Sequence, residues 1–150
     1  MAKREVLLVL HPTRPAAKEL AASIVKTLSS EGFTFISSLD TGIFGVTQVG
    51  SEQVKQKYSQ IELVLVLGGD GTILRGAEEI HGLNIPVLGI NLGHVGFLAE
   101  IGKPSQEEII SAIKEKNYKT EKRMTLAYQV FRSDELVTKG WALNEVTVER

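Results

Sequence analysis

Hydrophobic residues in the first 120 positions occur alternately in short strand-like stretches, such as the continuous run in residues 5–10, and in stretches with helical spacing. Four runs predict β-strands, at residues 5–10, 33–38, 63–67 and 85–91. Unbroken apolar runs are typical of parallel strands that other elements cover on both faces. The stretches between and after these runs predict helices. We therefore expect an α/β domain with a mainly parallel, Rossmann-like sheet flanked by helices.

Each predicted helix has an apolar stripe and identifiable ends. The core-facing positions are expected to be Ala17, Leu20, Ala21, Ile24, Val25 and Leu28, then Ile73, Leu74, Ala77 and Ile80, and finally Ile109, Ile110 and Ile113. Gly32 and Gly82 are placed to end the first two helices. Ser105 and Glu108 have the spacing of a capping box at the start of the third.

Two regions depart from this alternation. Residues 40–51 have no clear period and predict a loop, followed by a short helix near 52–58. From about Lys122, two β-patterned stretches joined by the polar turn RSDE predict antiparallel strands, because no crossover helix separates them. We therefore predict an α/β domain at residues 1–121 and the incomplete beginning of an all-β domain at 122–150. Exposed edges of an unfinished sheet predict that the isolated chain aggregates, dimerises through its last strands or leaves them disordered.

The composition is that of an ordinary globular protein. Of the 150 residues, 43% are hydrophobic and 23% are charged, and the net charge is -1. Because there is no basic field, nucleic acid is not an expected partner. No apolar stretch is long enough to span a membrane, and the lack of cysteine excludes disulfides and thiolate metal sites. We expect a cytoplasmic protein that binds neither nucleic acid nor membranes.

The segment LGGDGTIL, at residues 67–74, is the main candidate for chemistry. It joins a predicted buried strand to a predicted helix, so backbone N–H groups and the helix dipole favour phosphate there. A β-hairpin turn at this point is one alternative, and a simple helix cap by Asp70 or Thr72 is another. A carboxylate beside a bound phosphate needs either a bridging Mg²⁺ or a substrate hydroxyl whose proton it accepts. Both solutions imply phosphoryl transfer.

The basic side chains usual in phosphate sites are missing from this turn. No lysine follows the glycines, and neither GxxxxGK[ST] nor GxGxxG is present. Arg75, one helical position after the bend, and Arg14, at the neighbouring strand end, are candidates to reach a phosphate. A solvated surface arginine is the commoner role for each. His81 and His94 do not have the spacing of metal ligands, and we expect no set of protein side chains dedicated to a metal.

Three segments together resemble the NAD kinase family, in its bacterial form that uses ATP or polyphosphate. They are LGGDGTIL at 67–74, VLGINLGHVGFLAEI at 87–101 and ALNEVTVER at 142–150. The first segment alone is shared with diacylglycerol kinases and phosphofructokinases. The order and spacing of all three match NAD kinases over essentially the whole chain.

The resemblance implies an enzyme that phosphorylates the 2′-hydroxyl of the adenosine ribose of NAD to give NADP. ATP or polyphosphate would be the donor, with Mg²⁺ or another divalent cation. Asp70 would accept the hydroxyl proton, which is the catalytic role. The nucleotides would be bound by Gly68, Gly69, Gly71, Thr72, Arg75, Asn91, Phe97, Asn144 and Glu145. Each also has a structural alternative: a tight turn for the glycines and Asn91, core packing for Phe97, and an exposed strand edge for Asn144 and Glu145.

The sequence departs from the family in its extent. NAD kinases carry a larger β domain after the Asn-Glu segment, which closes the NAD pocket and supplies subunit contacts. This chain therefore resembles the N-terminal part of such an enzyme, and a full-length enzyme is expected to be a homo-oligomer. Catalysis by this chain alone stays open. So do two other functions, a diacylglycerol- or sphingosine-type lipid kinase domain and a non-catalytic nucleotide-binding module.

Overall fold

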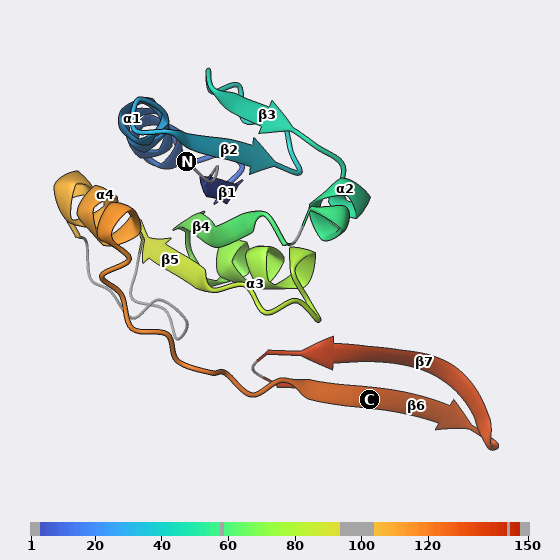
Figure 1. Ribbon diagram of the computed structural model, residues 1–150. Coiled ribbons are helices and arrows are strands. Elements are labelled where there is room, and N and C mark those ends of the chain that lie inside the picture. The colour runs from blue at the N-terminus through green and yellow to red at the C-terminus, as the bar shows by residue number, and fades with distance from the viewer. Residues whose placement is uncertain (1–3, 58, 94–103, 144, 148–150) are drawn as a thin grey trace. The chain divides into compact units, whose positions relative to one another are not determined.

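The computed structural model describes residues 4–57, 59–93, 104–143 and 145–147 (Figure 1). The chain divides into two compact units, Met1–Tyr118 and Lys119–Arg150. The first unit contains β1 (Arg4–Leu10), α1 (Pro15–Ser29), β2 (Phe33–Ser37), β3 (Val46–Gln48), α2 (Ser51–Gln56), β4 (Ile61–Gly68), α3 (Asp70–Glu79), β5 (Val87–Asn91) and α4 (Gln106–Glu115). The second unit contains β6 (Leu126–Arg132) and β7 (Glu135–Ala142).

The first unit has one sheet of five parallel strands, in the order β3-β2-β1-β4-β5. This confirms the predicted parallel α/β architecture. The chain winds outward from β1 to β2 and β3, then returns to place β4 on the other side of β1. The strand order therefore reverses between β1 and β4. In open sheets of this kind, ligands bind outside the carboxyl ends of the strands at this reversal.

The expectation of a loop throughout residues 40–51 was wrong in one respect. Val46–Gln48 forms the short edge strand β3, in which Val46 pairs with Phe35 of β2. Its sequence, VTQ, contains no hydrophobic run, and none of its three residues is fully buried. Its β conformation depends on hydrogen bonds to a neighbour, which a local pattern does not reveal. The short helix predicted after it is α2.

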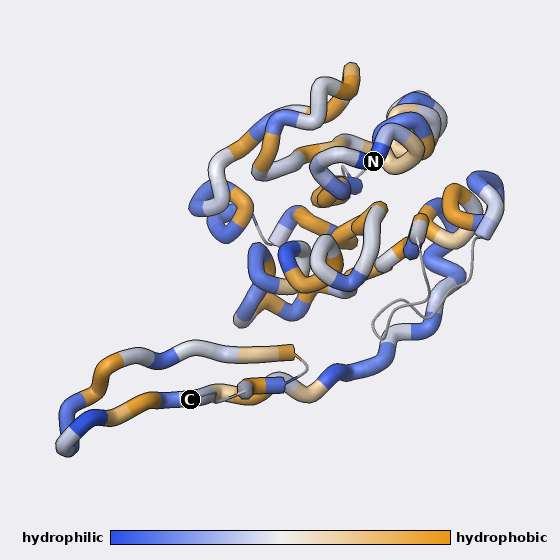
Figure 2. Tube along the Cα trace, turned by 180° about the vertical axis from the view of Figure 1, so that it is seen from behind, coloured by the Kyte–Doolittle hydropathy of each residue, from blue (hydrophilic) through white to orange (hydrophobic). Residues whose placement is uncertain are grey.

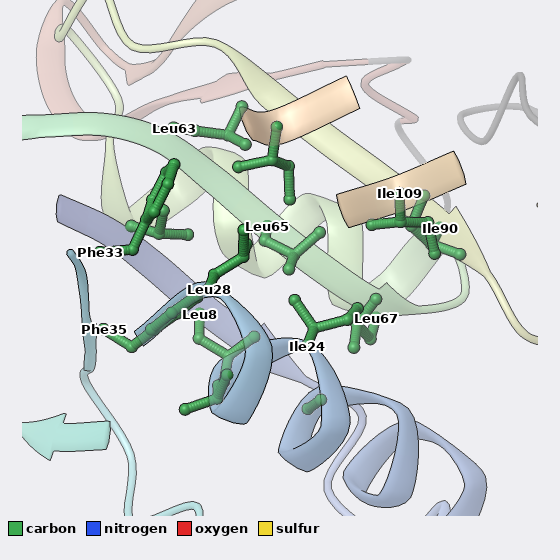
Figure 3. Close-up of a cluster of buried hydrophobic side chains, with 14 of the residues drawn as sticks. Leu8, Ile24, Leu28, Phe33, Phe35, Leu63, Leu65, Leu67, Ile90 and Ile109 are labelled. Atoms are coloured by element: carbon green, nitrogen blue, oxygen red, sulfur yellow. The ribbon is translucent and has the colours of Figure 1, made fainter. Parts of the chain in front are cut away.

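Helices cover both faces of the sheet, with α1 and α4 on one face and α2 and α3 on the other (Figure 1). Figure 3 shows the first of these contacts, where leucine and phenylalanine side chains of the strands meet Ile24 and Leu28 of α1 and Ile109 of α4. The capping box at α4 is confirmed, because Ser105 Oγ accepts from Glu108 N and Glu108 Oε2 accepts from Ser105 N. The predicted stripes of α1 and α4 face this core, with Leu20 and Ile110 partly buried at its margin.

The stripe predicted for α3 needs a correction. Ile73 and Ile80 are buried, but Leu74 is exposed, and the buried face of the helix also includes Thr72 and Gly76. A Cβ at Gly76 would lie 2.8 Å from Val66 Cγ2. The helix therefore approaches β4 so closely that only glycine fits, and this contact turns Leu74 away from the sheet.

The second unit is an antiparallel hairpin, as predicted. Its turn residues Ser133 and Asp134 both have positive φ, of 47° and 67°, the geometry that suits the twist of a two-residue hairpin loop. Hydrophobic and hydrophilic residues are interspersed along both strands (Figure 2), and they do not alternate strictly. Large apolar side chains on it are exposed, among them Phe131 and Val137, at 56% and 58%. Across the described residues of both units, no helix is long and apolar enough to cross a membrane.

Candidate functional site

The glycine turn after β4 joins a buried strand directly to a helix. Gly69 is the N-cap of α3 in an extended conformation, and Asp70 is the first helical residue. The carbonyl of Gly69 accepts from Thr72 N at 2.9 Å and from Ile73 N at 3.1 Å. The β-hairpin alternative is therefore wrong. The amino end of α3, with its partial positive charge, lies at the carboxyl edge of the sheet beside the carboxylate of Asp70.

The glycines of this turn differ in the space that surrounds them. A Cβ at Gly68 would lie only 2.3 Å from Thr72 Oγ1, so the fold itself requires glycine there. Thr72 is buried against this point. Gly69 occupies the N-cap position of α3, so neither Asp70 nor Thr72 is its N-cap residue. Around Gly69 and Gly71, by contrast, an added Cβ would meet nothing within 4 Å in the described part of the chain. Their open side leaves the backbone accessible to a ligand.

The ends of the neighbouring strands are tied to the turn by backbone hydrogen bonds. His11 N donates to Leu67 O at 2.9 Å, and Leu92 N donates to Gly68 O at 3.2 Å. Asn91 pairs with Gly68 in the β4–β5 register and is buried. Its Oδ1 accepts from Gly93 N at 2.8 Å, so its structural role as a turn former is confirmed. Asn91 and the glycine turn therefore lie side by side.

Arg14 extends from the end of β1 to the end of β5. A Cβ at Gly93 would lie 2.4 Å from Arg14 Nη1, so the guanidinium is packed against the Gly93 backbone. β1 and β5 both border β4, and neighbouring strands lie about 4.8 Å apart. Leu92, the residue before Gly93, donates to Gly68 O, so the Arg14 guanidinium lies near the glycine turn at the end of β4. From the sequence, Arg14 was one of two arginines that could reach a phosphate. Its place between the ends of β1 and β5 follows only from the strand order.

Arg75 is the sixth residue of α3. Burial raises the pKa of the Glu79 carboxyl one helical turn later, and the positive charge of Arg75 partly offsets this rise. Of the other predicted nucleotide contacts, Phe97 and Asn144 lie outside the described residues, as does His94. Glu145 is exposed and belongs to the second unit.

A cavity of about 460 Å³, which we call the β1–β2 cavity, opens where β1 and β2 end. Charged and hydroxyl side chains in its wall include His11, Arg14, Lys18, Ser38, Asp40 and Glu79. Ser38 Oγ donates a hydrogen bond to Glu79 Oε1. Burial raises the pKa of Glu79, against the smaller opposing effects of the Ser38 hydrogen bond and the Arg75 charge.

Sequence reasoning missed Ser38 and Glu79. Glu79 follows another glutamate near the end of an amphipathic helix, a position that usually faces solvent. The packing of α3 in the fold brings Glu79 to Ser38, which follows β2 and lies 41 residues earlier in the chain. The described residues contain no group of three His, Cys, Asp or Glu side chains able to hold a metal ion. A cation would therefore need ligands from elsewhere.

The parallel sheet, the reversal between β1 and β4 and the glycine turn at that reversal define a doubly wound α/β class of domain. Comparison of sequences narrows this class to a family. The sequence model of the ATP-NAD kinase N-terminal domain matches residues 6–118. The chain belongs to the NAD kinase family.

Curated relatives support this assignment over nearly the full chain. The NAD kinase of Corynebacterium diphtheriae is 43% identical over 154 residues, covering 97% of this chain and 49% of that protein. The NAD kinase of Mycobacterium tuberculosis is 37% identical over 163 residues, covering 99% and 53%. The chain thus spans about half the length of the curated relatives it matches. Among solved structures, yeast NADH kinase complexed with NADH has the same fold, with a TM-score of 0.73 at 21% identity over 95% of this chain and 45% of that one.

Proposed function

We propose that this chain supplies the phosphate-transfer half of an enzyme that phosphorylates the 2′-hydroxyl of the adenosine ribose of NAD. The observation that carries this proposal is the position of Asp70. It is the first residue of α3, at the point where the strand order reverses, between two glycines whose open sides leave the backbone accessible. The family assignment supports NAD as the acceptor.

In the proposed reaction, Asp70 accepts the proton of the ribose 2′-hydroxyl as its oxygen forms a bond to the γ-phosphorus of ATP. The bond from that phosphorus to the β,γ-bridging oxygen breaks, and ADP leaves with the bonding electron pair. Backbone N–H groups at the start of α3 stabilise the charge on the transferred phosphoryl oxygens. The products are NADP and ADP, and the proton leaves through Asp70.

A divalent cation fits this site only as a companion of the donor. Mg²⁺ takes most of its ligands from phosphate oxygens and water, with one or two carboxylates from the protein. Asp70 is the carboxylate at the turn. When bound, the cation neutralises charge on the donor phosphates. Polyphosphate presents the same phosphate chemistry and is the second proposed donor.

The acceptor pocket is proposed to include Asn91, Phe97, Asn144 and Glu145. Its support is the family resemblance of their segments and the place of Asn91 beside Gly68. We also propose that the complete enzyme is a cytoplasmic homo-oligomer. The cysteine-free sequence suits a reducing compartment, and the oligomeric state rests on the family resemblance alone.

The test is NADP formation from NAD and ATP. It is measured with the 150-residue chain and with the chain joined to the second half of the C. diphtheriae NAD kinase. Asp70→Asn is expected to lower kcat by about 10²- to 10⁴-fold while ATP binding persists. Glu78→Gln, an exposed change on the same helix, is the control. Transfer of phosphate to diacylglycerol instead of NAD would support a lipid kinase. Nucleotide binding without turnover in the joined protein would support a binding module.

A further inference from the structure

Within the described part of the chain, two buried polar atoms of residues that line the β1–β2 cavity have no hydrogen-bond partner. They are Arg14 Nη1, a charged donor, and Glu79 Oε2, an acceptor. Each such atom costs about 1–3 kcal/mol when it stays unpaired. Because one atom is a donor and the other an acceptor, a ligand that satisfies both must carry acceptors in one part and donors in another. The two other unpaired atoms among the described residues belong to Glu5 and Thr34, which are register neighbours near the other ends of β1 and β2.

The Arg14 side chain leads from this cavity to the glycine turn. It starts at the cavity wall and reaches the Gly93 backbone beyond β4. Its guanidinium therefore joins the cavity wall to Gly93, and the preceding residue Leu92 is hydrogen-bonded to Gly68 of the glycine turn. Guanidinium groups bind phosphate oxygens through charge-assisted hydrogen bonds. A phosphate chain on this path would satisfy the unpaired donor.

Glu79 presents the complementary group. Its Oε1 is fixed by Ser38 Oγ, which leaves Oε2 to accept another hydrogen bond. A carboxylate accepts readily from the hydroxyls of a ribose. In doubly wound folds, an acidic side chain near the end of the second strand commonly performs this task. Here the acid comes from the last residue of α3, the helix whose first residue is Asp70.

We propose that the β1–β2 cavity receives the nucleoside end of the phosphate donor. The ribose hydroxyls donate to Glu79, and the triphosphate runs along Arg14 to the glycine turn. This inference rests on the proposed function and deepens it. It favours a nucleoside triphosphate over inorganic polyphosphate as the donor, because polyphosphate would engage Arg14 but has no hydroxyl pair for Glu79.

The test compares two ligands by calorimetry on the 150-residue chain at fixed Mg²⁺: ATP and inorganic tripolyphosphate. Arg14→Met is expected to weaken both by about 10- to 100-fold, since each loses a charge-assisted hydrogen bond. Glu79→Gln is expected to weaken ATP about 10-fold and to leave tripolyphosphate within about twofold. Glu78→Gln, its exposed neighbour, should change neither affinity.

Further variants separate placement from charge and binding from folding. A Cβ at Gly93 would lie 2.4 Å from Arg14 Nη1, so Gly93→Ala should displace the guanidinium and weaken both ligands although the charge is kept. Glu79→Gln should not lower the unfolding midpoint in urea, because burial already disfavours the ionised carboxyl. A loss of ATP affinity without a loss of stability is a result that a merely structural role would not give.

Three results would overturn the inference. The wild-type chain could fail to bind ATP at millimolar concentration, Arg14→Met could bind both ligands normally, or Glu79→Gln could affect ATP and tripolyphosphate equally. The proposed function fails separately. A joined enzyme that forms no NADP, while the chain shows the expected binding pattern, refutes the kinase function and keeps the donor site. If the joined enzyme forms NADP and its Glu79→Gln variant has an unchanged KM for ATP, the kinase function stands and the donor site is refuted.

Discussion

Arg4 makes the most concentrated set of polar contacts described in the first unit, and its replacement is the sharpest test of the fold. Its guanidinium forms a bidentate pair with Glu62, at the start of β4, with one N–O distance of 2.8 Å. It also donates to the carbonyls of Ile113 and Lys114, at 2.8 and 2.7 Å, in the last turn of α4. The cation lies 4.2 Å from the ring centroid of Phe33. One side chain thus joins β1, β2, β4 and α4.

The expected cost of Arg4→Met follows from these contacts. The Arg4 and Glu62 side chains are 26% and 15% exposed, so each interaction is discounted for solvent. The two bonds to carbonyls contribute about 1 kcal/mol each, and the bidentate pair contributes about 1 more. Lys116 Nζ remains 3.3 Å from Glu62 Oε2, so the carboxylate does not become an isolated charge. We expect a loss of about 3 kcal/mol, and roughly half of that for Arg4→Lys, which keeps the charge but not the fork.

Urea unfolding followed by far-UV circular dichroism measures this loss. The single tryptophan, Trp141, lies in the second unit and would not report on the first. Lys55→Met removes an exposed pair with Glu52 at 3.9 Å and should change stability by less than about 0.5 kcal/mol. A loss below about 1 kcal/mol for Arg4→Met would refute the reasoning.

The same pair predicts a pH dependence. The hydrogen bond from Arg4 is the main cause that lowers the pKa of Glu62 from 4.5. A carboxyl with a lowered pKa in the folded state stabilises the protein above its unfolded pKa, and this stability disappears as the pH falls through the folded value. The difference between wild type and Arg4→Met should therefore be full near neutral pH and should narrow below about pH 4.5. A difference that stays constant down to pH 3 would contradict this.

Changes at four other positions give separable results. Gly68→Ala forces a Cβ against Thr72 and should cost about 1–3 kcal/mol in urea unfolding. Gly71→Ala has open space and should keep or raise stability while weakening ATP binding in calorimetry; equal stability losses would contradict the distinction. Ser105→Ala removes the α4 cap and should cost about 1 kcal/mol, whereas Ser105→Asp should largely retain it. The pKa of Glu79 is raised in the folded state, so its carboxyl lowers the free energy of unfolding as the pH rises above the ordinary carboxyl pKa. Glu79→Gln should therefore stabilise the chain at pH 7 but not near pH 4, and a pH-independent effect would refute this.

The sequence by itself determined the elements whose signals are local. The apolar runs specify β1 and β4, whose side chains are buried on both faces of the sheet. Shorter apolar stretches marked β2 and β5, and the capping box marks the start of α4. The glycine turn was recognisable because a backbone approached by phosphate needs glycine wherever it occurs. The hairpin followed from two β-patterned stretches around a polar turn.

Only the tertiary structure decided which distant residues meet. β3 exists because β2 offers it hydrogen-bond partners, and Leu74 is exposed because Gly76 lets α3 press against Val66. Arg14 could be told apart from other surface arginines only once β4 lay between β1 and β5. Glu79 reaches the end of β2 by the path of a whole helix. Local periodicity indicates which face of each segment is buried. These contacts instead depend on strand order and helix direction, which are fixed by packing between segments far apart in the chain.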